Sequence, residues 1–151
     1  MRLYRLLHFD TYQLCLSPLD ISEVERLAER QPEAFDAFWG DTAALHDHLI
    51  DLVRAGVDQR QFIDCDPELV ALHLCSAGES IQRRHRHAPS HAPAGPSRFR
   101  HPTYPPELIA EEMASMSVRS LLRDPGELPR IRAEAMAFND LARLSPGDAG
   151  A

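Results

Sequence analysis

Two consecutive helical segments between residues 40 and 82 constrain the fold of this 151-residue chain more than any other feature. In the first segment, apolar residues recur at helical spacing and form a broad stripe, at Leu45, Leu49 and Leu52 and at Ile50 and Val53. We expect this helix to end at Gly56, because glycine tolerates the left-handed conformation that a helix end often needs.

The second segment is apolar on nearly every side. Asp66 can cap free backbone N–H groups, and Pro67 suits the first position of a helix. From residue 69 to residue 77, only His73 and Ser76 interrupt the apolar side chains. Such a helix cannot bury one face alone, so we expect it to be covered by its own domain and by something else.

Four further segments have helical periodicity and predict an all-α helical bundle. In the segment at residues 22–30, Ser22 and Glu25 have the spacing of a capping box. No stretch alternates apolar and polar residues over the length of a strand, and we expect a single domain over residues 1–145. The four segments are residues 2–16, 22–30, 106–122 and 128–144.

Proline dominates the composition between residues 88 and 106, where six prolines occur. We predict a long disordered loop over residues 88–104 and a disordered tail over residues 146–151. His85, His87 and His91 could approach one metal ion, but neighbouring arginines repel cations and the segment lacks a rigid element. We therefore expect no metal and no cofactor.

The charge balance limits the classes of partner. The formal net charge is −7, and all sixteen basic residues are arginine, which argues against a large nucleic-acid surface. The three cysteines are scattered, and no apolar run approaches the roughly 20 residues that span a bilayer. We expect a cytoplasmic chain with reduced thiols and no membrane partner.

No catalytic motif stands out. The chain has no Gly-rich phosphate loop, no nucleophile elbow and no His-Glu-x-x-His pair. Cys65 precedes a helix but is flanked by two aspartates, which oppose thiolate formation. We therefore expect that the protein is not an enzyme.

The run LVRAGVDQRQFIDCDPELVALHL, residues 52–74, resembles part of the C-terminal regulatory domain of TetR-type transcriptional regulators. In that family a helix ends at a similar Ala-Gly, a short link holds a Phe, and Asp-Pro-Glu-Leu opens the dimerisation helix. The run RLYRLLHFDTYQLCLSP, residues 2–18, looks like the first helix of the same domain. The resemblance extends from about Arg2 to about Leu122, apart from the Pro/His-rich interval.

This resemblance implies a symmetric homodimer in which two helices from each copy, residues 67–84 and 106–122, form a four-helix interface. We expect the small residues Ala110, Ala114 and Ser117 to let a neighbouring helix come close, as Ala77 and Gly78 would on the earlier helix. The expected dimer interface comprises Leu69, Leu72, His73, Ser76, Ser80, Ile109, Met113, Met116 and Ser120.

The resemblance also implies a cavity for a small apolar effector. The aromatic residues among the candidates could equally pack in an ordinary core, and the polar ones could face solvent. The expected ligand-binding residues are Phe9, Tyr12, Gln13, Leu16, Phe35, Phe38, Trp39, His46, Ile50 and Val53.

In the resembling family a helix-turn-helix unit reads DNA. We expect this helix-turn-helix to be absent from the chain, so that nucleic acid would be bound only through a domain not present here. The expected function is the effector-binding and dimerisation domain of a TetR-like repressor. One alternative is a helical interaction module without a ligand, and another is a small metal- or thiol-dependent enzyme.

Overall fold

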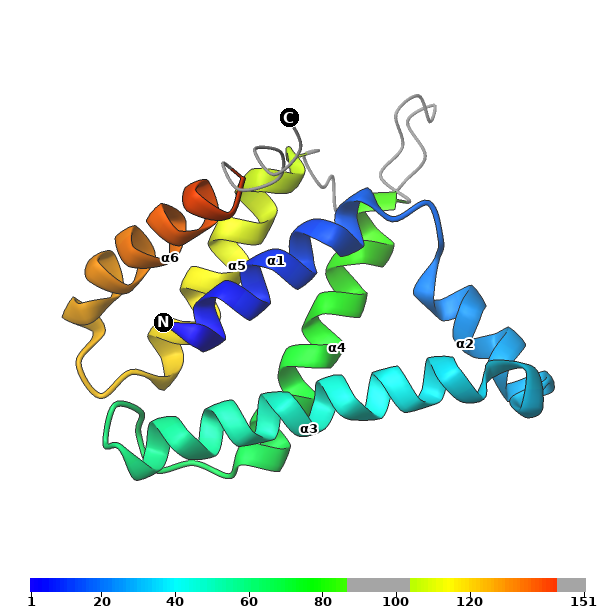
Figure 1. Cartoon of the computed structure of the whole chain (residues 1–151), viewed down its shortest axis with the longest axis horizontal. Coiled ribbons are helices and arrows are strands. Elements are labelled where there is room, and N and C mark those ends of the chain that lie inside the picture. The colour runs from blue at the N-terminus through cyan, green and yellow to red at the C-terminus, as the bar shows by residue number, and fades with distance from the viewer. Residues whose placement is uncertain (87–103, 144–151) are drawn as a thin grey trace, which may run out of the picture.

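A computed structural model describes residues 1–86 and 104–143, and within these ranges it contains six α-helices and no strand (Figure 1). The predicted all-α fold is confirmed. A 3-10 turn, Pro32–Phe35, precedes α3, and another, Pro125–Glu127, precedes α6. The helices are α1 (Arg2–Leu16), α2 (Ile21–Arg30), α3 (Asp36–Asp58), α4 (Pro67–Arg86), α5 (Pro106–Leu121) and α6 (Leu128–Arg143).

Helix α1 is the centre of the molecule. It packs against α5 along most of its length and also contacts α4, α3 and α6. Figure 1 shows α1 in front of α4 and α5, with α3 crossing the lower end of α4 and α2 on the side away from α6. Leu3, Tyr4 and Leu7 of α1 are buried in the core, together with Leu49 and Val53 of α3.

The two helix starts predicted from caps have different outcomes. At α4, the Oδ1 atom of Asp66 accepts hydrogen bonds from the backbone N–H groups of Glu68 and Leu69, at 2.9 and 3.3 Å, as predicted. At α2, Asp20 takes the capping role expected of Ser22, and its Oδ1 lies 3.4 Å from the Glu23 nitrogen. The helix begins one residue earlier than expected, because Asp20 offers both a side-chain and a backbone acceptor to the first turn.

The prediction that Gly56 ends a helix is wrong. Helix α3 continues to Asp58, and the residue with positive φ is Arg60, at 57°. The Phe62 ring packs directly on Gly56, and a Cβ atom there would overlap the ring. Gly56 therefore permits a close contact inside the chain rather than a left-handed backbone.

Three of the small residues of α4 and α5 pack within the chain. Ala110 and Ala114 are fully buried, and α5 packs mainly on α1. On α4, Gly78 is buried, and a Cβ there would lie 3.5 Å from Leu14 of α1. The expected close approach of a neighbouring helix is found at Ala110, Ala114 and Gly78, and that helix is α1 of the same chain.

A buried polar side chain attaches the α1–α2 connection to α4. Gln82 is only 1% exposed, and its Nε2 donates to the carbonyl oxygens of Leu14 and Leu19, at 3.2 and 3.1 Å. Its Oε1 accepts from the backbone N–H of Ile21 at 3.2 Å. All three contacts go to backbone groups of the α1–α2 connection and the start of α2, so Gln82 determines where α2 leaves the bundle.

The α3–α4 and α5–α6 connections are joined by a short antiparallel bridge between Phe62 and Leu122. The Ile63 N–H donates to Leu121 O at 2.7 Å, and the Arg123 N–H donates to Gln61 O at 3.0 Å. The Arg123 side chain adds a 2.8 Å hydrogen bond from Nε to Phe62 O. These bonds set the distance between the start of α4 and the end of α5.

The loop predicted at residues 88–104 lies outside the described residues except for Tyr104, and the tail at 146–151 lies outside them entirely, as do His87 and His91. None of the described helices combines the length and the apolar character that crossing a membrane requires.

Candidate functional site

The outer side of α4 exposes large apolar side chains. Leu69 is 65% exposed and Leu72 is 56% exposed. His73, Ser76 and Ser80 of the expected interface are also exposed. Leu69 and Leu72 therefore lie on a side of α4 that the described part of the chain leaves uncovered, as expected.

Helix α5 continues this surface. Met116 is 69% exposed, and Ser120 is exposed with its hydroxyl donating to Ser117 O at 2.8 Å. Ile109 and Met113 are half-buried. Met116 is therefore the most accessible apolar member of the expected interface on this helix.

A pocket of about 340 Å³ lies between α4 and α5, and it joins the two halves of the expected interface. Leu69 and His73 line it from α4, while Ser117 and Ser120 line it from α5. Leu69, His73 and Ser120 were all expected at the interface, so the fold brings residues about 50 positions apart in sequence onto one surface. We call this the α4–α5 surface, and it consists of Leu69, Leu72, His73, Ser76, Ser80, Met116 and Ser120.

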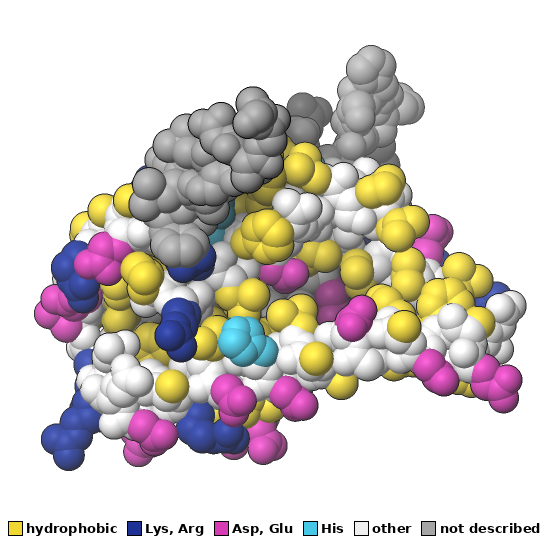
Figure 2. All heavy atoms as spheres, viewed as in Figure 1, with side chains coloured by type: hydrophobic (Ala, Val, Ile, Leu, Met, Phe, Trp, Pro, Cys, Tyr) yellow, Lys and Arg dark blue, Asp and Glu magenta, His cyan; other side chains and the backbone are white. Residues whose placement is uncertain are grey.

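The expected effector residues lie on α1, on α3 and in the turn that precedes α3, and they differ widely in exposure. Between α1 and α3 the surface is hollowed (Figure 2). Val53 is fully buried in the core, whereas Tyr12, His46 and Ile50 are half-buried. Figure 2 shows hydrophobic side chains on both sides of this hollow, which is open to solvent in that view. Phe9, another expected effector residue, is largely exposed, at 61%.

Two expected effector residues line a shallow pocket at the end of α1. Gln13 and Leu16, both exposed, border a space of about 430 Å³ together with Asp10 and Ser17. The expected α3 residues are not part of this pocket. The expected cavity residues are thus divided between the core, an open hollow and this surface pocket.

The aromatic group at the start of α3 packs on itself. The Phe35 and Phe38 ring centroids are 6.4 Å apart at 89°, and those of Phe38 and Trp39 are 5.2 Å apart at 67°. Both are edge-to-face arrangements, which are favourable beyond their buried area. Trp39 remains 37% exposed, so its indole can report on ligands that enter the hollow.

Carboxyl groups face the space between α1, α2 and α4. Burial raises the pKa of Asp10 above its ordinary value of 3.8. Burial also raises the pKa of Glu25, and the nearby carboxylates of Glu79 and Glu29 add to this increase. Ionisation of these carboxyls is therefore less favourable in the folded chain than in water.

The thiols have raised pKa values and are poor nucleophiles at neutral pH. Burial raises the pKa of Cys15 and of Cys75, and the carboxylates of Glu79 and Asp10 raise that of Cys75 further. The pKa of Cys65 is raised first by burial and then by its two aspartate neighbours in the sequence. This environment favours the protonated thiol, so the structure offers no activated cysteine among the described residues.

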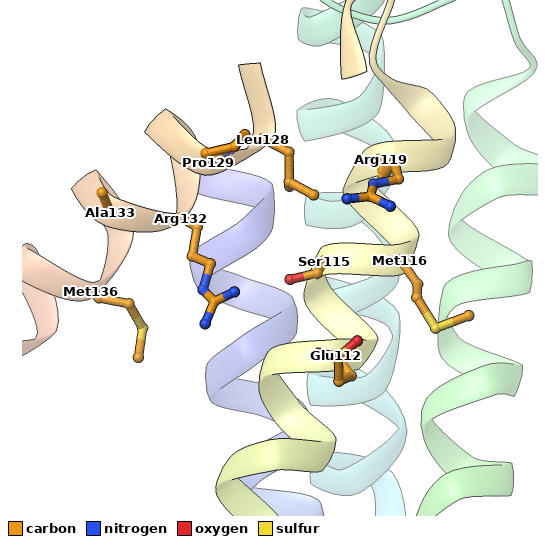
Figure 3. Close-up of a pocket in the computed structure, with 9 residues that line it drawn as sticks. All are labelled: Glu112, Ser115, Met116, Arg119, Leu128, Pro129, Arg132, Ala133 and Met136. Carbon is orange, nitrogen blue, oxygen red and sulfur yellow. The ribbon is translucent and has the colours of Figure 1, made fainter. Parts of the chain in front are cut away.

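A pocket that the sequence did not suggest lies between α5 and α6, with a volume of about 470 Å³. Figure 3 shows Arg132 of α6 and Ser115 of α5 pointing toward one another, while Leu128 of α6 reaches toward Arg119 of α5. The only signal in the sequence was that α5 and α6 are amphipathic. Their relative placement, which the periodicity does not contain, creates the pocket.

No protein-family model, no curated protein and no solved structure matches this chain. The TetR resemblance, which rests on residues 2–18 and 52–74, therefore stays a prediction.

Proposed function

We propose that this chain is the dimerising regulatory domain of a TetR-like transcriptional regulator, and that two copies associate through their α4–α5 surfaces. The observation that supports the proposal best is the exposure of three large apolar side chains, Leu69 and Leu72 on α4 and Met116 on α5. The bridge between Phe62 and Leu122 and the pocket between Leu69 and Ser120 link the start of α4 to the end of α5.

A second copy suits this surface for two physical reasons. Burying a side chain the size of leucine or methionine contributes about 1.5–3 kcal/mol, and a two-fold axis brings each such residue into the contact twice. The α4–α5 surface carries few charges, with Asp66 at the edge of its pocket, although 26% of the chain is charged. Two chains of net charge −7 repel each other, and a contact area with few charges reduces that repulsion.

The regulatory part of the proposal concerns a small apolar effector. The hollow between α1 and α3 would hold it, with Tyr12, Phe38, Trp39 and His46 at its walls. An effector that binds one arrangement of the dimer more tightly than another would shift the equilibrium between them. Reading of DNA is assigned to no residue of this chain, and no catalytic role is assigned either.

The variant Met116→Arg tests the dimer. It would place a charge at the centre of the contact without a partner, which costs about 3–5 kcal/mol when such a charge is buried, so we expect dissociation to rise by at least 100-fold. Met116 is exposed in the single chain, and folding should therefore be unaffected. Sedimentation equilibrium measures the association constant, and circular dichroism checks the helix content.

The matched control is Ala44→Arg, which adds the same charge at an exposed position of α3. It should leave the association constant unchanged. A wild-type chain that remains monomeric at high micromolar concentration, or a Met116→Arg chain that still dimerises like wild type, would refute the proposal.

One observation favours the alternative of an interaction module without a ligand. Val53 and Leu49, on the wall expected for the effector, are 0% and 4% exposed and belong to the packed core. A filled core needs no ligand to be stable. Quenching of Trp39 fluorescence by a panel of apolar compounds would favour the effector-binding domain, and its absence in a chain that still dimerises would favour the interaction module.

A further inference from the structure

The pocket between α5 and α6 combines a free cationic group with an apolar wall. Arg119 is exposed at its border, and no carboxylate in the described part of the chain contacts its guanidinium. The other arginine of the pocket, Arg132, forms an ion pair with Glu111 and is thereby neutralised. Arg119 thus has unused hydrogen-bond donors next to the pocket.

The wall beside Arg119 is apolar. Leu128 is buried at 5% exposure, Met136 is half-buried and Met116 is exposed, and all three line the pocket. Figure 3 shows Leu128 next to Arg119, and Met136 farther along α6, away from Arg119. A volume of about 470 Å³ is within the range of pockets that hold small organic molecules, on the order of 300–1,000 Å³.

We infer that this pocket binds a small amphipathic carboxylate, with the carboxylate on Arg119 and the apolar body on Leu128 and Met136. A guanidinium presents paired N–H donors whose geometry matches the two oxygens of a carboxylate. The inference goes beyond the proposed function, because it requires neither dimerisation nor DNA binding.

The carboxylate of Glu112, which also lines the pocket, determines the orientation of the bound ligand. Glu112 lies seven residues before Arg119 on α5, so the two are about 10 Å apart along the helix axis at 1.5 Å per residue. That distance is about one screening length at physiological salt, so Glu112 repels a carboxylate at the Arg119 end only weakly. The same Glu112 would oppose a ligand that entered with its carboxylate at the other end.

Titration calorimetry with decanoate, kept below the concentration at which it forms micelles, tests this inference. We expect decanoate to bind at one site per chain and at least tenfold more tightly than decan-1-ol or decyltrimethylammonium, which share the apolar body but lack the negative charge. Equal affinity for all three would overturn the inference, as would an absence of decanoate binding.

Two pairs of variants localise the site. Arg119→Gln should weaken decanoate binding at least tenfold, whereas Arg54→Gln, which removes an arginine paired with Asp51 on α3, should not change it. Ala133→Phe should fill the pocket and abolish binding, whereas Ala137→Phe, at an exposed position of α6 outside the lining, should leave it intact. Binding that survives both Arg119→Gln and Ala133→Phe would contradict the site.

A further variant separates this inference from the proposed function. Leu72→Arg alters the α4–α5 surface without touching the pocket lining, so it should retain decanoate binding whether or not it abolishes dimerisation. A chain that stays monomeric but binds decanoate would refute only the proposed dimer. A wild-type chain that dimerises but does not bind decanoate would refute only the pocket inference.

Discussion

Helix α4 has two apolar sides with opposite characters. Its inner side is made of buried residues that pack on α1 and α3, and its outer side is exposed and includes the bulky Leu69 and Leu72. The inner row is Ala71, Leu74, Gly78 and Gln82, and the outer row is Leu69, Leu72, Ser76 and Ser80.

Helix α5 has the same contrast between a buried side and an exposed side. Ala110, Ala114 and Val118 are buried against the rest of the chain, while Met116 and Ser120 are exposed. The comparison teaches that an apolar side chain on these helices serves one of two purposes. Inner residues should affect the free energy of unfolding, whereas outer residues should affect association and leave the single chain intact.

The largest effect expected on the inner side is that of Ala114→Leu. Ala114 is 0% exposed on the side of α5 that meets α1, so three added carbons would force the helices apart. We expect a loss of about 3 kcal/mol in the free energy of unfolding, at the upper end for overpacking. Urea unfolding measures it, and Ala55→Leu at an exposed position of α3 is the control. A loss equal to that of the control would break the distinction between the two sides.

A smaller effect is expected for Gln82→Leu. The substitution keeps the volume but leaves the Ile21 N–H and the carbonyls of Leu14 and Leu19 without this partner. We expect a loss of about 2 kcal/mol, because buried polar groups without partners are costly. Gln13→Leu, at an exposed position of α1, should be nearly neutral in the same urea titration. If both variants unfold alike, Gln82 does not hold α2 to the bundle.

The smallest effect concerns the half-buried Asp10, whose pKa is raised by burial above 3.8. Below its ordinary pKa, the Asp10 carboxyl is protonated in the folded and the unfolded chain, and the stability linked to the protonated form is fully present. This stability is lost as the pH rises through the higher pKa of the folded chain, because burial opposes ionisation. Asp10→Asn should therefore unfold at a higher urea concentration than wild type at pH 7 and at nearly the same concentration at pH 3.

The control for this titration is Asp47→Asn, at an exposed position of α3. It should shift the urea midpoint little at either pH. An Asp10→Asn chain that is less stable than wild type at pH 7 would show that the Asp10 carboxylate is stabilised rather than desolvated.

Several features were readable in the sequence because they depend on neighbours along the chain. The helical segments and the cap at Asp66 belong to this group, as does the second apolar side of α4. The cap of α2 was assigned to Ser22 instead of Asp20, because both residue types can cap and only the backbone geometry distinguishes them.

Other features depend on contacts between distant residues. Gly56 looked like a helix end, but Phe62 six positions later folds back onto it. Arg119 and Arg132 gave no signal in the sequence, because the pocket between them exists only once α6 lies beside α5. The buried Gln82 could have been noticed, since it continues the spacing of Leu74 and Gly78 along the inner row.

By itself the sequence determined that the chain is helical and that α4 has more apolar surface than one face can bury, since both follow from the 3.6-residue period. The tertiary structure decided which apolar residues go inside. Ala110, Ala114 and Gly78 pack within the chain because α1 passes close to them, and Leu69, Leu72 and Met116 stay outside because no other described helix covers them. Helical periodicity defines the faces of a helix, but the identity of the neighbour on each face is a property of the whole fold.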